Sequence, residues 1–318
     1  MSPPFRVLCS LALLIPSLLR ADTSPSVEIF QLDPVDAKRD RTVPLKIYQQ
    51  PGDTAQPIVL FSHGLGGSRN NNAFLGNEWA KHGYTAVFMQ HAGSDEKVWK
   101  SAERSQRMAA MKSAANLESS LNRFVDVPFV IDQLERWNEE EGHRLFRKLD
   151  LEHIGLSGHS FGAITSQALM GQKFPLDYNF ADDRIDAFIL MSPSTGKGIT
   201  PAEAFGQVRS PVLCLTGTKD TSAIQANMPA ESRRDVYRAM PEGDKFQLVF
   251  QDANHFAFSD TSFFKENRIP HHHSAIQLVT TQFWNAYLKG DTEAKAGLQS
   301  EAFREAANLV ADDVWEWK

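Results

Sequence analysis

The fold of this chain is decided by the stretch Leu156-Ser157-Gly158-His159-Ser160-Phe161-Gly162-Ala163. It joins a short apolar run, typical of a strand, to a run that is typical of a helix. The stretch contains G-x-S-x-G, the pattern of a sharp strand-to-helix turn with an exposed serine, here Ser160, at its tip. Its two outer glycines allow helix and strand to approach closely. The N–H groups that begin the helix point toward the serine and favour an anion there.

Apolar runs on both sides of this turn predict a mainly parallel sheet. The predicted elements are strands at 27–32, 43–48, 57–62, 84–89, 185–191, 211–216 and 246–250, and helices at 72–82, 230–240, 276–288 and 294–310. Continuous apolar strands that alternate with helices are typical of parallel α/β sheets with helices on both faces. The first two strands instead alternate in polarity and are joined by a charged turn, which indicates an antiparallel N-terminal edge. We therefore predict one α/β domain over residues 22–318.

A polar insertion is predicted between the central strands. Residues 91–122 are charged and carry little sustained apolar periodicity, so we expect them to cover one end of the sheet. An apolar stripe from Phe124 to Leu134 then predicts a helix. Pro128 fits the first turn of that helix, with Asp126 as its N-cap.

The N-terminus has the features of a secretory signal peptide over residues 1–21. Arg6 gives a weak positive charge, Val7 to Leu19 is apolar, and Ala21 stands at a plausible cleavage position. The alternative is an N-terminal membrane anchor, but the apolar run is too short for a stable membrane span. We therefore expect a secreted or periplasmic protein.

Composition excludes some function classes. The chain has 318 residues and a net charge of −6, so it lacks the basic footprint of a nucleic-acid-binding protein. Of its two cysteines, Cys9 lies in the predicted signal peptide and Cys214 in an apolar strand. No disulfide within the mature chain is expected, and Cys214 is predicted to pack in the core.

A serine hydroxyl is a weak nucleophile at neutral pH and needs an adjacent base, most often histidine. His255 lies directly after the strand at 246–250. In a parallel sheet the carboxyl ends of the strands share one edge, so His255 can reach Ser160 there. His159, next to Ser160 at the turn, points elsewhere and is a poor candidate.

The base needs an acid to orient it. Asp220 follows the strand at 211–216, whereas the segment after the preceding strand, Met191 to Thr195, contains no acid. Asp252 and Asp260 are weaker candidates because of their positions near His255. Asp220 is therefore predicted, and the chain order Ser, Asp, His is the order that this type of turn requires.

Backbone N–H groups are needed to bind an oxyanion. Phe161, directly after the serine, should supply one of them. The glycine-rich loop His63–Gly67 follows an earlier strand and should supply the second, from Leu65 or, as the alternative, from Gly66.

The whole pattern resembles the α/β-hydrolase family over nearly all of the mature chain. Within that family it resembles bacterial serine esterases described as dienelactone-hydrolase-like or platelet-activating-factor-acetylhydrolase-like. The motifs that carry it are Ser62-His63-Gly64-Leu65-Gly66-Gly67, Gly158-His159-Ser160-Phe161-Gly162, Asn254-His255 and Phe283–Asp291. Dienelactone hydrolases proper use cysteine where this chain has Ser160, so the resemblance does not imply that this chain shares their substrate.

The resemblance implies an α/β-hydrolase fold and a Ser–His–Asp mechanism with an acyl-enzyme and no cofactor. The expected substrate is a small-molecule or lipid-like carboxylic ester. A lipid- or polyester-directed hydrolase or an acyltransferase would use the same residues, and a non-catalytic binding protein would be expected to lack one of them.

Other histidines invite different interpretations. His271-His272-His273 could suggest a metal site, but adjacent histidines do not share a helix face and no ligand motif accompanies them, so no metal is predicted. His91 and Trp99 could line a substrate pocket or could pack the insertion.

Overall fold

The computed structural model describes residues 26–196, 198–222, 224, 228–260 and 269–318. The predicted signal peptide at 1–21 lies outside these residues, so export stays a prediction. Within the described ranges, no helix combines the length and apolar character needed to cross a bilayer.

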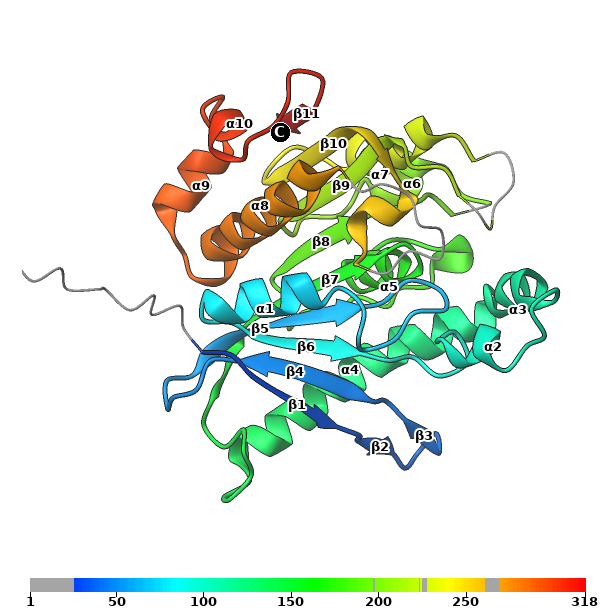
Figure 1. The fold of residues 1–318 in the computed structure, drawn as a ribbon, viewed down its shortest axis with the longest axis vertical. Helices are drawn as coiled ribbons and strands as arrows, with labels where there is room; N and C mark the ends of the chain where they lie inside the picture. Colours follow the sequence, from blue (N-terminus) through cyan, green and yellow to red (C-terminus); the bar gives the residue numbers. More distant parts are fainter. Residues whose placement is uncertain (1–25, 197, 223, 225–227, 261–268) are drawn as a thin grey trace, which may run out of the picture.

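One large sheet runs through the molecule (Figure 1). The strands are β1 (Glu28–Leu32), β2 (Val35–Asp36), β3 (Arg41–Thr42), β4 (Leu45–Gln49), β5 (Gln56–Ser62), β6 (Thr85–Met89), β7 (Leu149–His159), β8 (Ala187–Met191), β9 (Val212–Lys219), β10 (Lys245–Asn254) and β11 (Val314–Trp317). In the described part of the chain, nine of them form the sheet in the order β1-β4-β6-β5-β7-β8-β9-β10-β11, and β2 and β3 form a separate hairpin.

The strand directions confirm the predicted α/β-hydrolase fold. Strands β6, β5, β7, β8, β9 and β10 are parallel to one another, whereas β4 pairs antiparallel with β6 and β1 antiparallel with β4. The charged turn predicted after β1 contains the β2–β3 hairpin. The far edge of the sheet was not predicted, because β11 adds an antiparallel strand to β10.

Helices cover both faces of the sheet. They are α1 (Ala73–Lys81), α2 (Lys97–Lys100), α3 (Arg107–Ala114), α4 (Leu117–Glu139), α5 (Phe161–Leu169), α6 (Pro201–Phe205), α7 (Asp235–Ala239), α8 (Pro270–Leu288), α9 (Thr292–Leu298) and α10 (Phe303–Ala306), with short 3-10 turns η1 (Pro175–Asp177), η2 (Ala230–Arg234) and η3 (His255–Phe258). Helices α4 to α7 pack on one face and α1 and α8 on the other, which gives two apolar clusters.

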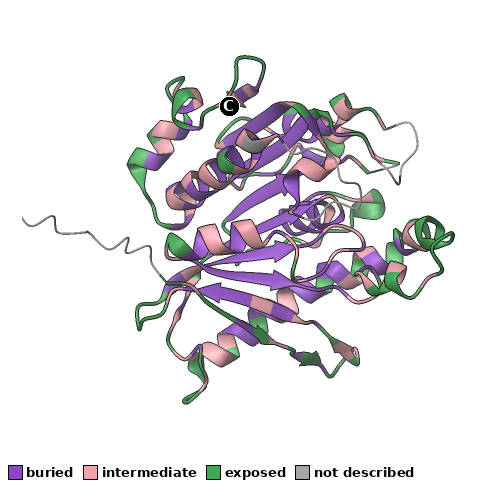
Figure 2. Cartoon of the chain, in the orientation of Figure 1, coloured by how far each residue is buried: buried purple, intermediate pink, exposed green. Residues whose placement is uncertain are grey.

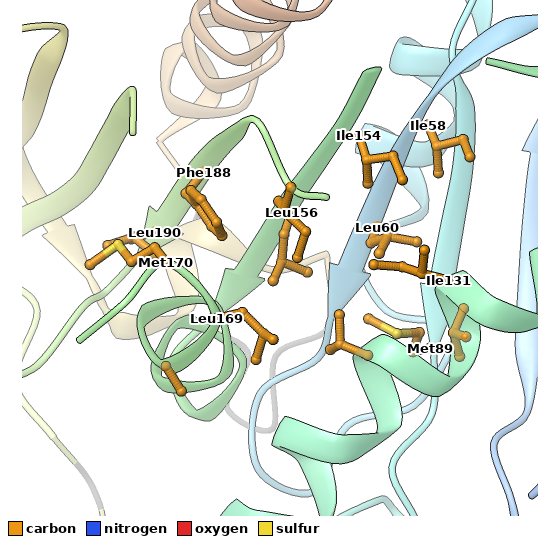
Figure 3. Packing of buried hydrophobic residues seen from close by; sticks show 14 of the residues in the cluster. Ile58, Leu60, Met89, Ile131, Ile154, Leu156, Leu169, Met170, Phe188 and Leu190 are labelled. Carbon is orange, nitrogen blue, oxygen red and sulfur yellow. The ribbon is translucent and has the colours of Figure 1, made fainter. Parts of the chain in front are cut away.

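The sheet is buried between these layers. In Figure 2 the central strands are buried, whereas α2 and α3 are largely exposed. Figure 3 shows Ile131 of α4 and Leu169 of α5 against strand residues such as Leu60 and Leu156. On the other face Trp79 and Trp284 meet edge to face, with ring centroids 6.0 Å apart. Cys214 is fully buried, as predicted.

The helix predicted to have Asp126 as its N-cap begins ten residues earlier, with Leu117. Asn116 is its N-cap and accepts a hydrogen bond from the N–H of Ser119 at 2.9 Å. Pro128 therefore lies inside α4, and Asp126 lies buried in it rather than at its start. The prediction was wrong because the polar residues before Phe124 are typical of a surface insertion, whereas Ser119 and Arg123 among them are buried.

The C-terminal helix predicted over 294–310 is divided into α9 and α10. Trp315 of β11 explains the break, because its ring lies 4.9 Å from that of Phe303 and its indole N–H donates to the carbonyl of Leu298 at 3.1 Å. A continuous helix could not place Leu298 and Phe303 around the same tryptophan. The predicted helix at 230–240 is likewise divided, into η2 and α7.

The turn between β7 and α5 is sterically demanding. Ser160 has φ 55° and ψ −110°, a conformation that is strained for a residue with a side chain. A Cβ atom on Gly158 would lie 2.2 Å from the carbonyl oxygen of Gly162, and one on Gly162 would lie 1.8 Å from the carbonyl oxygen of Ser62. Both positions of the motif therefore require glycine.

We predict that Gly162→Ala is severely destabilising. The added methyl group would meet the backbone of β5, a central strand that cannot move aside, so the loss in free energy of unfolding should be about 3 kcal/mol or more. Gly297→Ala is the matched control, since a Cβ there meets nothing within 4 Å in helix α9 and should stabilise by about 1 kcal/mol. Urea unfolding of both variants measures this, and unchanged stability of Gly162→Ala would contradict the packing argument.

Candidate active site

The three residues predicted to act together lie in contact. Ser160 follows β7, Asp220 follows β9 and His255 follows β10, so all three lie at the carboxyl edge of the sheet. Nε2 of His255 lies 2.9 Å from Oγ of Ser160, and Nδ1 of His255 lies 2.7 Å from Oδ1 of Asp220. Because a carboxylate accepts hydrogen bonds, Nδ1 carries the proton and Nε2 can accept the proton of the serine.

The backbone around His255 is fixed from two directions. The pairing of β10 with β9 is interrupted between Phe250 and Asn254, and the chain turns there into η3. Nε2 of His159 donates to the carbonyl oxygen of His255 at 3.0 Å. Burial, with the charge of His255, lowers the pKa of His159 to about 3. His159 is therefore a neutral support for the loop, which agrees with its dismissal as a base.

Asp220 is a fully buried carboxylate. Thr216 donates to its Oδ2 at 2.9 Å, and Nε of Arg233 lies 3.5 Å from its Oδ1. Burial raises the pKa of this carboxyl, but the hydrogen bond from His255 and the nearby charges outweigh that effect and lower the pKa to about 2. The group is thus an anion at neutral pH beside the imidazole.

The other two acids considered from the sequence are engaged elsewhere. Asp252 pairs with Lys219 at 2.9 Å on the exposed end of the strands. Asp260 accepts hydrogen bonds from the N–H groups of Asn72 and Ala73, at 2.7 and 2.6 Å, at the start of α1.

The predicted oxyanion donors lie in the wall of the same cavity as Ser160. Phe161 is the first residue of α5, where a helix leaves its N–H groups without internal acceptors. The N–H of Gly66 already donates to the carbonyl of Ser94 at 2.8 Å. That bond favours Leu65 over the alternative, Gly66, as the second donor.

The cavity has a volume of about 930 Å³, and the insertion forms one part of its wall, together with the loop after β5, the start of α5 and the segments around Ser222 and His255. Its apolar lining includes Leu65, Trp99, Met108, Met111, Leu117, Ile164 and Phe256. Trp99 lines the cavity and also packs within the insertion, since the guanidinium carbon of Arg107 lies 5.5 Å from the centroid of its ring. Its indole N–H donates to the carbonyl of Gly66 at 2.7 Å.

His91 lies beneath the cavity wall rather than in it. It is fully buried, with Nε2 2.9 Å from Oγ of Ser62 and Nδ1 2.9 Å from Oδ2 of Asp126. Burial, reinforced by the charge of Arg123, lowers the pKa of His91 to about 4. Of the two expectations for His91, internal packing is therefore the one observed.

Asp126 joins this buried group to the N-terminal hairpin. Nε and Nη2 of Arg41 each donate to its carboxylate at 2.8 Å, and Arg39 donates at 2.8 Å as well. Burial raises the pKa of Asp126, but the hydrogen bonds from His91 and Arg41 outweigh it and hold the pKa well below the ordinary value. Sequence patterns missed this network because a polar residue on a helix gives no local sign of burial.

The three adjacent histidines lie near the start of α8. His271 has Nε2 3.4 Å from Oδ2 of Asp313, His272 is buried, and His273 stacks on Phe74 with ring centroids 4.1 Å apart. Among the described residues, no group of three or more histidine, cysteine, aspartate or glutamate side chains is arranged to hold a metal ion.

Comparison with known proteins supports the resemblance seen in the motifs. Residues 42–119 match the family model for platelet-activating factor acetylhydrolase, isoform II. The chain is similar to that family. The matched segment contains the loop His63–Gly67 and the cavity-forming insertion, while Ser160, Asp220 and His255 lie beyond it. No curated protein matches the chain. Match and fold together support a serine ester hydrolase in general.

We predict that the stabilising effect of Asp220 depends on pH. Its folded pKa of about 2 lies below the unfolded value of about 3.9, so the carboxylate stabilises the fold above about pH 4, and this stabilisation is lost as pH falls through about 2. Asp220→Asn should therefore be less stable than wild type by on the order of 2 kcal/mol at neutral pH, with the difference shrinking toward pH 2. Urea unfolding at several pH values measures it; a difference that does not vary with pH would contradict the assigned cause.

Proposed function

We propose that this protein is a serine carboxylic-ester hydrolase that works through an acyl-enzyme intermediate. The observation that carries the proposal is the pair of hydrogen-bond distances from His255, 2.9 Å to the Ser160 hydroxyl and 2.7 Å to the Asp220 carboxylate. The strained backbone at Ser160 adds to it, because such strain is typical of functional positions.

The first half of the reaction forms the acyl-enzyme. Nε2 of His255 takes the proton of Ser160 as Oγ attacks the ester carbonyl carbon. The N–H groups of Leu65 and Phe161 bind the oxygen on which negative charge develops. When the tetrahedral intermediate collapses, the bond to the alcohol breaks and His255 returns the proton to the departing oxygen.

The second half releases the acid. Water gives a proton to His255 and attacks the acyl carbon, and Ser160 leaves with that proton restored. Asp220 holds the imidazole in the tautomer with the proton on Nδ1 and stabilises its charged form. These residues complete the cycle without a cofactor.

The cavity favours an ester with a sizeable apolar part. A volume of about 930 Å³ lies at the upper end for small-molecule sites, and several large apolar side chains, among them Trp99, Met108 and Met111, line it. This supports a lipid-like ester over a small polar one as the substrate.

We predict that Ser160→Ala loses esterase activity and covalent labelling together. Removing the nucleophile should lower kcat on a short p-nitrophenyl ester by roughly 10⁵-fold or more. A fluorophosphonate probe should label wild type at Ser160, as read by peptide mass. Ser274→Ala is the control. This serine is exposed on α8, far from Ser160 in the sequence, and its hydroxyl donates to the carbonyl of His271 in the same helix. Near-normal turnover by Ser160→Ala would remove the proposal.

We also predict that activity rises with acyl length. Each methylene buried in the apolar cavity should contribute about 0.8 kcal/mol, or roughly fourfold in kcat/KM, until the cavity is filled. A series of p-nitrophenyl esters from acetyl to octanoyl measures this, with Ser160→Ala as the background. An optimum at acetyl, the acyl group in the name of the matched family, would show that the cavity does not receive the acyl chain.

A further inference from the structure

A cation lies fully buried beneath the loop that is proposed to bind the oxyanion. Arg123 of α4 has no exposed surface, and burial lowers the pKa of its guanidinium to about 9, against the opposing charge of Asp126, so it stays charged at neutral pH. Burying such a charge costs several kcal/mol of desolvation free energy unless its N–H groups make hydrogen bonds inside the protein. The hydrogen-bond partners of these N–H groups therefore indicate what Arg123 does.

The guanidinium binds two loops at the carboxyl edge of the sheet. One terminal nitrogen donates to the carbonyl of His63 at 2.7 Å and to Oγ of Ser62 at 3.3 Å. Nε donates to Oγ of Ser94 at 2.8 Å. The carbonyl of Ser94 in turn accepts the N–H of Gly66. Arg123 thus holds the loop on both sides of Leu65, at His63 directly and at Gly66 through Ser94.

The same guanidinium contacts the other proposed donor. Its central carbon lies 4.4 Å from the centroid of the Phe161 ring, a cation–π contact. Arg123 therefore touches both segments whose N–H groups are proposed to bind the oxyanion, one from the loop after β5 and one from the start of α5.

A second set of hydrogen bonds orients the guanidinium itself. Ser62, which accepts from Arg123, lies 2.9 Å from Nε2 of His91, and His91 donates to Asp126. Two neutral groups, the imidazole of His91 and the hydroxyl of Ser62, thus connect the carboxylate of Asp126 to the guanidinium of Arg123. A forked, planar cation suits this arrangement, because a lysine ammonium could not reach the His63 carbonyl, Ser94 and the aromatic face at once.

We propose that Arg123 is a positioning residue that sets the spacing between the N–H groups of Leu65 and Phe161 and so tunes stabilisation of the oxyanion. The inference rests on the proposed esterase function and deepens it. Arg123 would act through these two residues without touching the substrate.

The test compares an ester with its thionoester, in which sulfur replaces the carbonyl oxygen. Sulfur accepts hydrogen bonds weakly, so a well-spaced oxyanion site prefers the oxygen compound. Arg123→Lys should lower kcat/KM for the oxygen ester by about 10²-fold, the loss of roughly one donor, while the thionoester loses much less. The preference for oxygen should thus fall by at least about tenfold, with little change in KM.

Two further variants separate positioning from folding. Arg184→Lys is the matched control, because Arg184 also makes several polar contacts, to Asp182, Asp132 and Glu135, but on the surface; its oxygen preference should equal that of wild type. Ser94→Ala removes one acceptor of Arg123 and is a milder change. It should lower the preference in the same direction by a smaller factor, and it decides the matter if Arg123→Lys does not fold.

The outcomes distinguish this inference from the proposed function. If both ester types lose activity equally in Arg123→Lys, or in Ser94→Ala where the former does not fold, Arg123 is merely structural and the inference is overturned. The same holds if neither variant changes the preference while wild type is still labelled at Ser160. If wild type is not labelled at Ser160, the esterase proposal itself fails, and the positioning role fails with it.

Discussion

The site depends on one close packing contact, that of the first turn of α5 against the end of β5. Gly162 lies so near the carbonyl of Ser62 that no side chain fits between them. This contact brings Ser160, Phe161 and the loop after β5 to the same place. The same turn gives Ser160 a positive φ, so the position of its hydroxyl at the cavity and the nearness of the two proposed N–H donors follow from one steric constraint.

Two Ser–His–Asp arrangements with nearly equal distances lie near this contact, Ser160–His255–Asp220 and Ser62–His91–Asp126. Their roles differ because they differ in burial. His255 keeps 17% of its side chain exposed and faces a cavity, whereas His91 is fully buried and its pKa falls to about 4. A histidine in that environment cannot readily accept a proton, and Ser62 cannot meet a substrate. The buried set instead connects the N-terminal hairpin, α4 and the loop His63–Gly67.

The insertion between β6 and α4 links the sheet to the cavity. It lies against the loop His63–Gly67 through the bonds of Trp99 and Ser94 to Gly66, and its side chains form one part of the cavity wall. The segment that matches a known family covers this loop and insertion. Similarity in that segment therefore concerns the cavity and the loop proposed to bind the oxyanion more directly than Ser160, the proposed nucleophile.

The sequence alone was enough to predict the glycine-bounded turn at Ser160, the parallel core and the chain order Ser160, Asp220, His255, because these depend on local periodicity and on steric rules within a few residues. The meeting of Asp220 and His255 could also be predicted, since parallel strands place their carboxyl ends at one edge. Tertiary structure alone decided that Asp126 and Arg123 are buried, that Pro128 lies within a longer helix, and that Val314–Trp317 completes the sheet. Each of these depends on a partner distant in the chain, and the free energy of burying a charge or pairing an edge strand leaves no periodic trace in the segment itself.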